Sequence, residues 1–223
     1  MSTNVRDAKS GSTFPPMEPG TYPATCCGVI DLGLQKTTFE GIEREVNQIL
    51  ITWEFPDELL EINGEMKPRR ISNTYTFSTS EKAKLRKDLK TWRGRDFTEA
   101  ELRDFDIANI LGAPCLVNIV NVSRNGNTYA NMAGCVKLPK GMTVPQPSVK
   151  MHFDIDDRGT WGVFADLPEW IRAKINNGLT FAEKGIRLDK NGKVFDFSAT
   201  VPNDHPAIDG IAESIDDNEE LPF

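Results

Sequence analysis

Apolar and polar residues alternate along several stretches of the first 140 residues. The clearest case is residues 48–55, where Ile49, Ile51, Trp53 and Phe55 alternate with mostly polar neighbours. A period of two residues is typical of a β-strand with one apolar face. The same kind of pattern predicts four further strands, at residues 21–39, 69–78, 113–123 and 127–138.

The pattern becomes helical between the third and fourth predicted strands. Apolar residues at near-helical spacing predict a helix over residues 80–92, which we expect Ser80 to cap. Thr98, followed three residues later by Glu101, forms a capping box. This second signal predicts another, short helix before the fourth strand.

The order of these elements indicates a fold. Five strands with a helix between the third and fourth are typical of the OB-fold, a small Greek-key barrel that binds oligonucleotides and oligosaccharides. We therefore expect a mainly β protein, a five-stranded OB-fold barrel with a helical insert, at residues 19–140. We expect residues 56–68 to be a loop with its turn at 63–64, and residues 125–127 to turn a hairpin.

Beyond residue 140 the chain changes character. Residues 141–202 begin with a Pro-containing linker, and we expect them to form an extension with a short helix that begins near Pro168 and ends at Gly178. Its apolar residues are expected to pack this extension onto the barrel: Trp161, Phe164, Trp170 and Ile171. Residues 185–202 have no pattern that we can assign.

The end of the chain carries its net charge. The sequence has 26 Lys and Arg against 33 Asp and Glu, and seven of those acids lie in residues 203–223, which contain no Lys or Arg. Acidic sequence with little apolar content cannot bury enough surface to offset its ordering entropy, so we expect residues 203–223 to be a disordered tail. At the other end, we expect residues 1–18 to be a flexible arm. The final Phe223 favours an interaction tail. A merely solubilising tail is the alternative.

Residues 66–95 hold ten Lys and Arg against two acids. A basic patch with exposed aromatic residues is typical of single-strand binding, because cations track the phosphates and rings stack on the bases. The candidate DNA-binding residues are Phe39, Lys67, Arg69, Arg70, Tyr75, Lys84, Lys87, Trp92, Arg93, Arg95 and Tyr129. Arg69 and Arg70 are favoured because strands 2 and 3 form the usual OB binding face. The helix lysines fit a solvated face equally well, Tyr75 fits the core better, and Trp92 fits a helix anchor.

The end of the tail, residues 216–223, resembles the C-terminal tip of bacterial single-stranded DNA-binding proteins: a run of acids, then an aliphatic residue, Pro and Phe. A final Phe after acids is also typical of T7-type phage single-strand binders. In those families the tip docks on replication and repair proteins. The resemblance implies these partner-binding residues: Asp216, Asp217, Glu219, Glu220, Leu221, Pro222 and Phe223.

The body of the chain resembles phage-encoded single-strand binders over residues 20–140. The shared details lie at residues 92–95, 97–98, 111–112 and 114–115. This resemblance implies an OB-fold that coats single-stranded DNA, but it transfers no individual contact residue.

Other classes of protein lack support in the sequence. We find no P-loop, HExxH or GxSxG motif, and expect neither an enzyme nor a cofactor or metal. No apolar run approaches the ~18 residues of a membrane span, and the N-terminus has no secretory pattern, so we expect the cytoplasm of a bacterial host. The cysteines are expected to be free, buried thiols: Cys26, Cys27, Cys115 and Cys135.

The sequence thus predicts a protein that coats single-stranded DNA without strong sequence specificity during phage DNA replication, recombination or repair, and recruits partners through its tail. The alternatives are a protein-interaction adaptor, an RNA-binding or strand-annealing recombination mediator and, less favoured, a nuclease. The sequence leaves open whether the chain forms a homo-oligomer. The charges also suggest that the free tail lies over the basic surface, in which case deleting residues 204–223 would raise DNA affinity at low salt.

Overall fold

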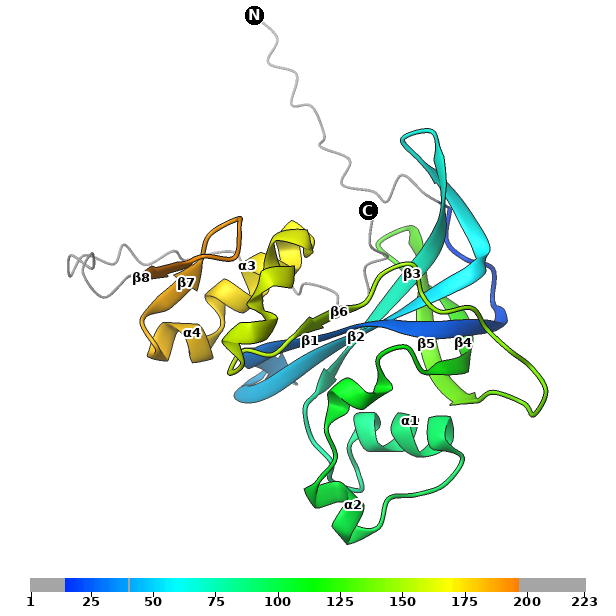
Figure 1. Cartoon of the computed structure of the whole chain (residues 1–223), viewed down its shortest axis with the longest axis horizontal. Helices are drawn as coiled ribbons and strands as arrows, with labels where there is room; N and C mark the ends of the chain where they lie inside the picture. The colour runs from blue at the N-terminus through cyan, green and yellow to red at the C-terminus, as the bar shows by residue number, and fades with distance from the viewer. Residues whose placement is uncertain (1–14, 40, 197–223) are drawn as a thin grey trace, which may run out of the picture.

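A computed structural model describes residues 15–39 and 41–196 of the chain (Figure 1). Its main feature is an antiparallel sheet in the order β3-β2-β1-β4-β5. The strands are β1 (Gly20–Phe39), β2 (Ile42–Ile62), β3 (Glu65–Thr76), β4 (Pro114–Arg124) and β5 (Asn127–Lys137). Within the described residues no strand pairing joins β3 to β5, so the sheet is not a closed barrel.

The five predicted strands are all present, but the loop predicted at residues 56–68 is wrong. β2 runs through much of that stretch and pairs with β3, which begins at Glu65. The predicted turn at 63–64 is confirmed, and both of its residues have positive φ. An irregularity in the pairing between Phe55 and Leu59 takes the polar, Pro-containing segment out of register, so the strand continues beyond it.

One face of the sheet packs on the helices between β3 and β4. α1 (Lys84–Arg93) buries Leu85, Leu89 and Trp92 in a core with inward residues of all five strands. Trp92 donates from Nε1 to the carbonyl of Pro114, 3.0 Å away, and Tyr75 donates from its hydroxyl to Asp88, 2.9 Å away. α1 therefore lies against both β3 and β5, at the side where those two strands do not pair (Figure 1).

The two predicted helix starts had different outcomes. Ser80 as the cap of α1 is wrong, because the helix begins at Lys84 and its N-cap residue, Ala83, makes no side-chain hydrogen bond. The capping box is confirmed at α2 (Glu99–Arg103): the N–H of Glu101 donates to Thr98 Oγ1 at 3.2 Å, and the N–H of Thr98 donates to Glu101 Oε2 at 2.9 Å. A 3₁₀ helix, η1 (Ile107–Ile110), then leads into β4.

The extension covers the other face of β1 and β2. It consists of β6 (Met151–Phe153), η2 (Arg158–Asp166), α3 (Glu169–Asn177), α4 (Leu179–Glu183), β7 (Ile186–Leu188) and β8 (Val194–Asp196). β6 runs parallel to β1, and Trp161, Phe164 and Ile171 share a second core with Ile30 and Leu50 of the sheet. The helix predicted from Pro168 to Gly178 is confirmed, whereas the β7–β8 hairpin had no sequence signal.

This second core corrects the prediction for β2. The strand was expected to bury one face only, yet Gln48, Leu50, Thr52 and Glu54 on the opposite face are buried too. The reason is tertiary, because the linker and the extension cover that face. Residues 15–18 also belong to the packed body rather than to the expected arm, since Met17 is buried in the first core.

Two further expectations can be compared with the structure. The cysteines are free and buried, as predicted: Cys26, Cys27, Cys115 and Cys135. Among the described residues no helix is long and apolar enough to cross a membrane.

Candidate nucleic-acid interface

A polar pocket of about 450 Å³ lies where β3 ends and α1 begins. We call it the hydroxyl pocket, and its lining residues are Thr74, Tyr75, Thr76, Ser78, Ser80, Lys82, Ala83 and Lys84. Thr74 and Thr76 reach it together because side chains two residues apart point to the same side of a strand. The pocket thus combines four Ser and Thr side chains with two lysines.

Backbone geometry adds further donors at this place. The first turn of α1 contains no acidic residue, so the positive end of the helix dipole is not neutralised by its own side chains. In addition, Thr74 Oγ1 is buried and has no hydrogen-bond partner among the described residues. Lysines, hydroxyls and helix N–H groups are the donors that bind phosphate oxygens, so the hydroxyl pocket suits an anionic group.

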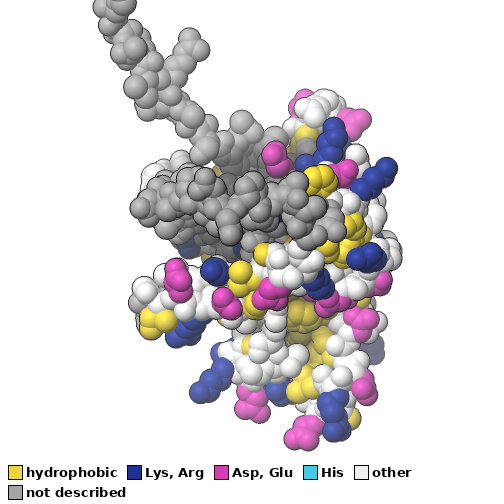
Figure 2. All heavy atoms as spheres, turned by 90° about the vertical axis from the view of Figure 1, so that its left-hand side faces the viewer, with side chains coloured by type: hydrophobic (Ala, Val, Ile, Leu, Met, Phe, Trp, Pro, Cys, Tyr) yellow, Lys and Arg dark blue, Asp and Glu magenta, His cyan; other side chains and the backbone are white. Residues whose placement is uncertain are grey.

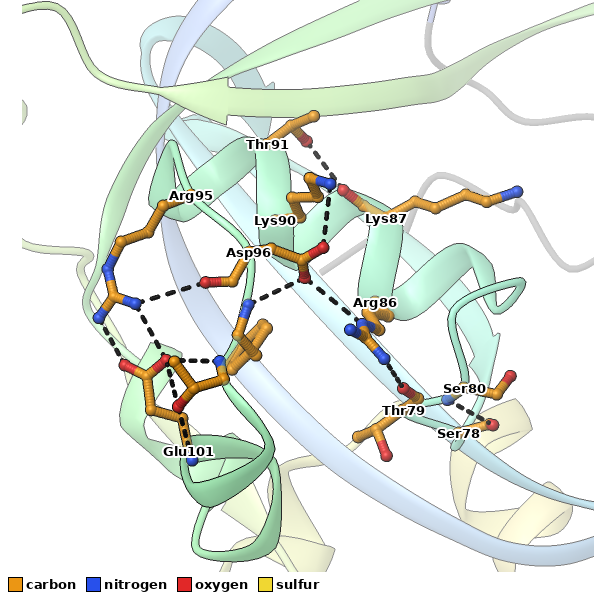
Figure 3. A network of polar contacts seen from close by, with 12 residues as sticks. Ser78, Thr79, Ser80, Arg86, Lys87, Lys90, Thr91, Arg95, Asp96 and Glu101 are labelled. Carbon is orange, nitrogen blue, oxygen red and sulfur yellow. Dashed lines mark hydrogen bonds and ion pairs between the residues drawn. The ribbon is translucent and has the colours of Figure 1, made fainter.

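The lysines around the pocket are available. Lys82 and Lys87 are exposed, and neither forms an ion pair with any residue that the structure describes. Figure 3 shows the Lys87 side chain extending away from the neighbouring polar network. Lys84 is only loosely held, with its Nζ 3.6 Å from Asp88 and 5.0 Å from the ring centroid of Tyr75. These three cations could contact phosphates without first breaking a strong ion pair.

Two other cations of the same helix are paired. Arg86 and Lys90 both contact Asp96, at 3.4 Å and 2.9 Å (Figure 3). The hydrogen bond from Lys90, followed by one from the Phe97 N–H, lowers the pKa of the Asp96 carboxyl. This acid lies one residue beyond the basic window 66–95, so the window overstated the free positive charge.

Arg93 and Arg95, two candidate DNA-binding residues, share a second acid, Glu101 (Figure 3 shows its contact with Arg95). Arg93 donates to it at 2.7 Å and also lies over the Phe97 ring, 4.0 Å from the centroid. Hydrogen bonds from Arg95, then from the Thr98 N–H and from Arg93, hold the pKa of the Glu101 carboxyl well below its usual range. These arginines stabilise the turn between α1 and α2.

The β3 arginines are engaged as well. Arg69 is 8% exposed and donates to the carbonyl of Pro15 at 2.6 Å. Arg70 contacts Glu54 at 2.9 Å and donates to Ser148 of the linker, also at 2.9 Å. The linker therefore covers the part of the β2–β3 face that sequence reasoning favoured for DNA.

The remaining polar and aromatic candidates lie apart from the pocket or cannot be placed. Lys67 pairs with Glu65 at 3.1 Å in the β2–β3 hairpin. Tyr129 is half-buried on β5, near the β4–β5 turn, where its hydroxyl accepts a 3.4 Å hydrogen bond from Asn127. Phe39 ends β1, and its side chain lies outside the described part of the structure. The tail candidates from Asp216 to Phe223 also lie outside the described residues.

Two of the aromatic residues that were candidates for stacking on bases are core residues. Tyr75 is 3% exposed and Trp92 is 7% exposed, so neither ring can receive a base in this conformation. Phe77 is the aromatic residue that sequence reasoning missed. The strand predicted over residues 69–78 would place it on the same face as Ile71 and Tyr75. Instead β3 ends at Thr76, and the Phe77 ring is 41% exposed, between two residues that line the hydroxyl pocket, Thr76 and Ser78.

A sequence signal for this site did exist. Hydroxyl residues stand at every second position from 74 to 80, directly before a Lys-rich helix. Lys82 lay in the basic window but was not singled out. On the face shown in Figure 2, Lys and Arg side chains are interspersed with Asp and Glu over the described surface.

Comparison of the chain with protein-family models, with curated protein sequences and with solved structures finds no match in any of the three.

Proposed function

We propose that this protein binds single-stranded DNA without strong sequence specificity, in phage DNA replication, recombination or repair, and that the hydroxyl pocket is part of its DNA-contacting surface. The observation that carries the proposal is the pocket that Lys82 and Lys84 line together with four Ser and Thr hydroxyls. The exposed Phe77 lies in sequence between two of the lining residues, and the exposed Lys87 follows Lys84 by about one helical turn. Each of these groups suits one part of a nucleotide.

The lysines and hydroxyls would bind backbone phosphates, which supply most of the affinity in non-specific binding. The Phe77 ring would stack on one base, a contact that tolerates any sequence because every base has an aromatic face. Duplex DNA keeps its bases stacked inside, so Phe77 favours a single strand over a duplex.

The strand order supports the same class of function. The order β3-β2-β1-β4-β5, with α1 inserted between β3 and β4, is compatible with an OB-fold opened between its third and fifth strands. We infer an OB-type architecture in which α1 fills the opening. The hydroxyl pocket would then lie at the edge of that opening.

The tail supplies the second part of the proposal. Its acids and the final Leu221, Pro222 and Phe223 suit a partner protein that has a small apolar pocket with a basic rim. We propose that the tail recruits replication, recombination or repair proteins to the coated strand.

A protein-interaction adaptor is the second candidate. The observation in its favour is the ion pairing of Arg70, Arg86, Lys90, Arg93 and Arg95, which leaves fewer cations for DNA than the sequence suggested.

Fluorescence anisotropy with labelled oligo-dT, the matching duplex and a single-stranded RNA, each over a salt series, tests the proposal. We expect tight oligo-dT binding that weakens steeply with salt, and much weaker duplex binding. Absence of oligo-dT binding in dilute buffer would leave the adaptor, and stronger RNA than DNA binding would indicate an RNA partner.

A further inference from the structure

An apolar groove of about 410 Å³ lies at the other end of α1, between that helix, η1 and the end of β5. Leu89, Trp92, Phe105, Ile110 and Leu138 supply most of its walls. Leu89, Trp92 and Ile110 continue into the core below, so the floor of the groove is rigid. A groove of this size and chemistry suits one or two apolar side chains.

Basic groups stand at the groove, and no acid lines it. Arg93 uses Nη2 to hold Glu101, but its Nη1 nitrogen is buried and has no hydrogen-bond partner among the described residues. An unpaired buried donor is costly and is normally satisfied by an acceptor. Lys137 is the second cation: it is exposed and pairs with no acid in the described part of the chain.

Gly94 allows Lys137 to lie close to the end of α1. This glycine ends the helix with φ of 76°, and a Cβ added there would stand 3.0 Å from Lys137 Cδ. The stem of Lys137 therefore packs along the groove while its ammonium group remains exposed.

We infer that this groove receives the C-terminal tip of the same chain. The Phe223 ring and Leu221 would enter the apolar part, and the terminal carboxylate would accept a hydrogen bond from Arg93 Nη1. Glu219 and Glu220 would lie near Lys137. Each feature of the groove thus has a counterpart within the last five residues of the chain.

The tail is long enough for this docking. Twenty-seven residues, 197–223, follow Asp196, the last described residue. At about 3.3 Å per residue they span up to about 90 Å. A domain of this size has a radius of gyration of about 16 Å. The tip can therefore reach any point on the surface.

The groove and the hydroxyl pocket lie at opposite ends of α1, which is about 15 Å long at 1.5 Å per residue. Docking of the tip therefore does not depend on DNA binding, and either can fail without the other. The tip would therefore occupy one specific groove, and it would not cover the basic surface in general.

Photo-crosslinking of the full-length protein tests the location. Phe223 would be replaced by p-benzoylphenylalanine, and the irradiated monomer would be digested and mapped by mass spectrometry at low protein concentration. Intramolecular cross-links to Leu89, Phe105, Ile110 or Leu138 are the expected result. Cross-links spread over other surfaces, or formed only between two chains, would overturn the inference.

A peptide experiment tests the chemistry without a bulky label in the groove. A fluorescein-labelled peptide of residues 213–223 would be titrated onto the full-length Phe223→Ala variant, whose own tip lacks the ring. We expect binding, weaker binding to the wild-type chain because its own tip competes, and loss of binding for a peptide that ends in Ala.

Lys137→Glu added to that variant should weaken peptide binding about three- to tenfold, as expected for reversal of one exposed charge. Lys140→Glu is the matched control, because it makes the same charge change three residues along at an exposed position outside the groove. Equal weakening by both substitutions, or no peptide binding at all, would contradict docking in this groove. Far-ultraviolet circular dichroism of each variant would verify that the fold is retained.

Discussion

The two ends of helix α1 differ in what their cations do. Around the N-terminal end, Lys82 and Lys87 are exposed without an ion pair among the described residues, and Lys82 lines a pocket together with Ser and Thr hydroxyls. At the C-terminal end, Arg93 and Arg95 share Glu101, next to an apolar groove. One basic helix thus has unpaired lysines and a polar pocket around one end, and paired arginines with an apolar groove at the other.

The difference shows that a count of charges along the sequence does not measure the charge available to a ligand. The acids that neutralise the C-terminal end, Asp96 and Glu101, follow the last residue of the helix by three and eight positions and pair with cations before them in the chain. An ion pair must be broken before its cation can bind a phosphate, so paired arginines contribute less to DNA affinity than free lysines do. We therefore expect substitutions at the two ends of α1 to have different effects on DNA affinity.

The largest effect is expected from Lys82→Gln, Lys84→Gln and Lys87→Gln combined. Each single-strand phosphate contact contributes about 0.7 to the slope of log K against log salt, so loss of three contacts lowers oligo-dT affinity about 100-fold near 0.1 M salt. Anisotropy titrations over a salt series would measure both the affinity and the slope.

The control for that variant is Lys190→Gln combined with Lys193→Gln, two exposed lysines around the β7–β8 hairpin of the extension. We expect this pair to leave affinity nearly unchanged. Comparable losses in both variants would show that DNA responds only to net charge and that the hydroxyl pocket has no special part.

Phe77→Ala should have the next largest effect. Removal of one stacking ring costs about 1–3 kcal/mol per base, so we expect oligo-dT affinity to fall about tenfold or more with little change in the salt slope. Phe195→Ala removes another exposed ring, 54% exposed in the extension, and serves as the control. An unchanged affinity for Phe77→Ala would remove the stacking contact from the account.

Glu101→Gln tests the C-terminal end through stability. Because the pKa of Glu101 is lowered in the folded state, its charge stabilises the fold above the unfolded pKa, and this stabilisation is lost as the pH falls through the folded value. Gln preserves the capping box with Thr98 but not the charge. We expect Tm to fall at pH 7 and the difference from wild type to shrink in acid, in thermal melts across pH.

Glu99→Gln is the matched control, since Glu99 lies in the first turn of the same short helix and forms no ion pair with the residues that the structure describes. A Tm difference for Glu101→Gln that stayed constant down to strongly acid pH would mean that the ion pairs with Arg93 and Arg95 contribute no stability.

The smallest effect is expected from Arg95→Gln. Arg95 is well exposed, and the hydrogen bond to Glu101 raises the pKa of its guanidinium. Because this cation is already neutralised, we expect oligo-dT affinity to change less than about twofold in the same titration. A loss of oligo-dT affinity as large as that caused by substitution of a pocket lysine would mean that the C-terminal end of α1 also contacts DNA.

Features of the fold that depend on neighbouring residues could be predicted. The capping box of Thr98 and Glu101 acts over three residues, and the turn at 63–64 over two, so the sequence displays both completely. Alternation along β2 likewise identified a strand. Its second buried face could not be predicted, because the residues that cover it lie about a hundred positions away.

The candidate site was also predicted only where neighbouring residues determine it, and was missed where distant residues do. Lys84 lines the pocket, as its position at the start of a basic helix allowed, and Lys87 follows it by about one turn of that helix. Arg70 was misjudged because its partners are distant: Glu54 accepts hydrogen bonds from Ser148, 94 residues further along the chain. Phe77 was missed because the end of β3, only one residue before it, decides whether its ring is buried.

Amide hydrogen exchange of the full-length protein, with and without saturating oligo-dT, tests the central claim most directly. The account predicts that bound DNA slows exchange in residues 76–87, at the end of β3 and the start of α1, and leaves residues 93–103 nearly unchanged. Protection confined to residues 93–103, or DNA binding with no protection of residues 76–87, would contradict it.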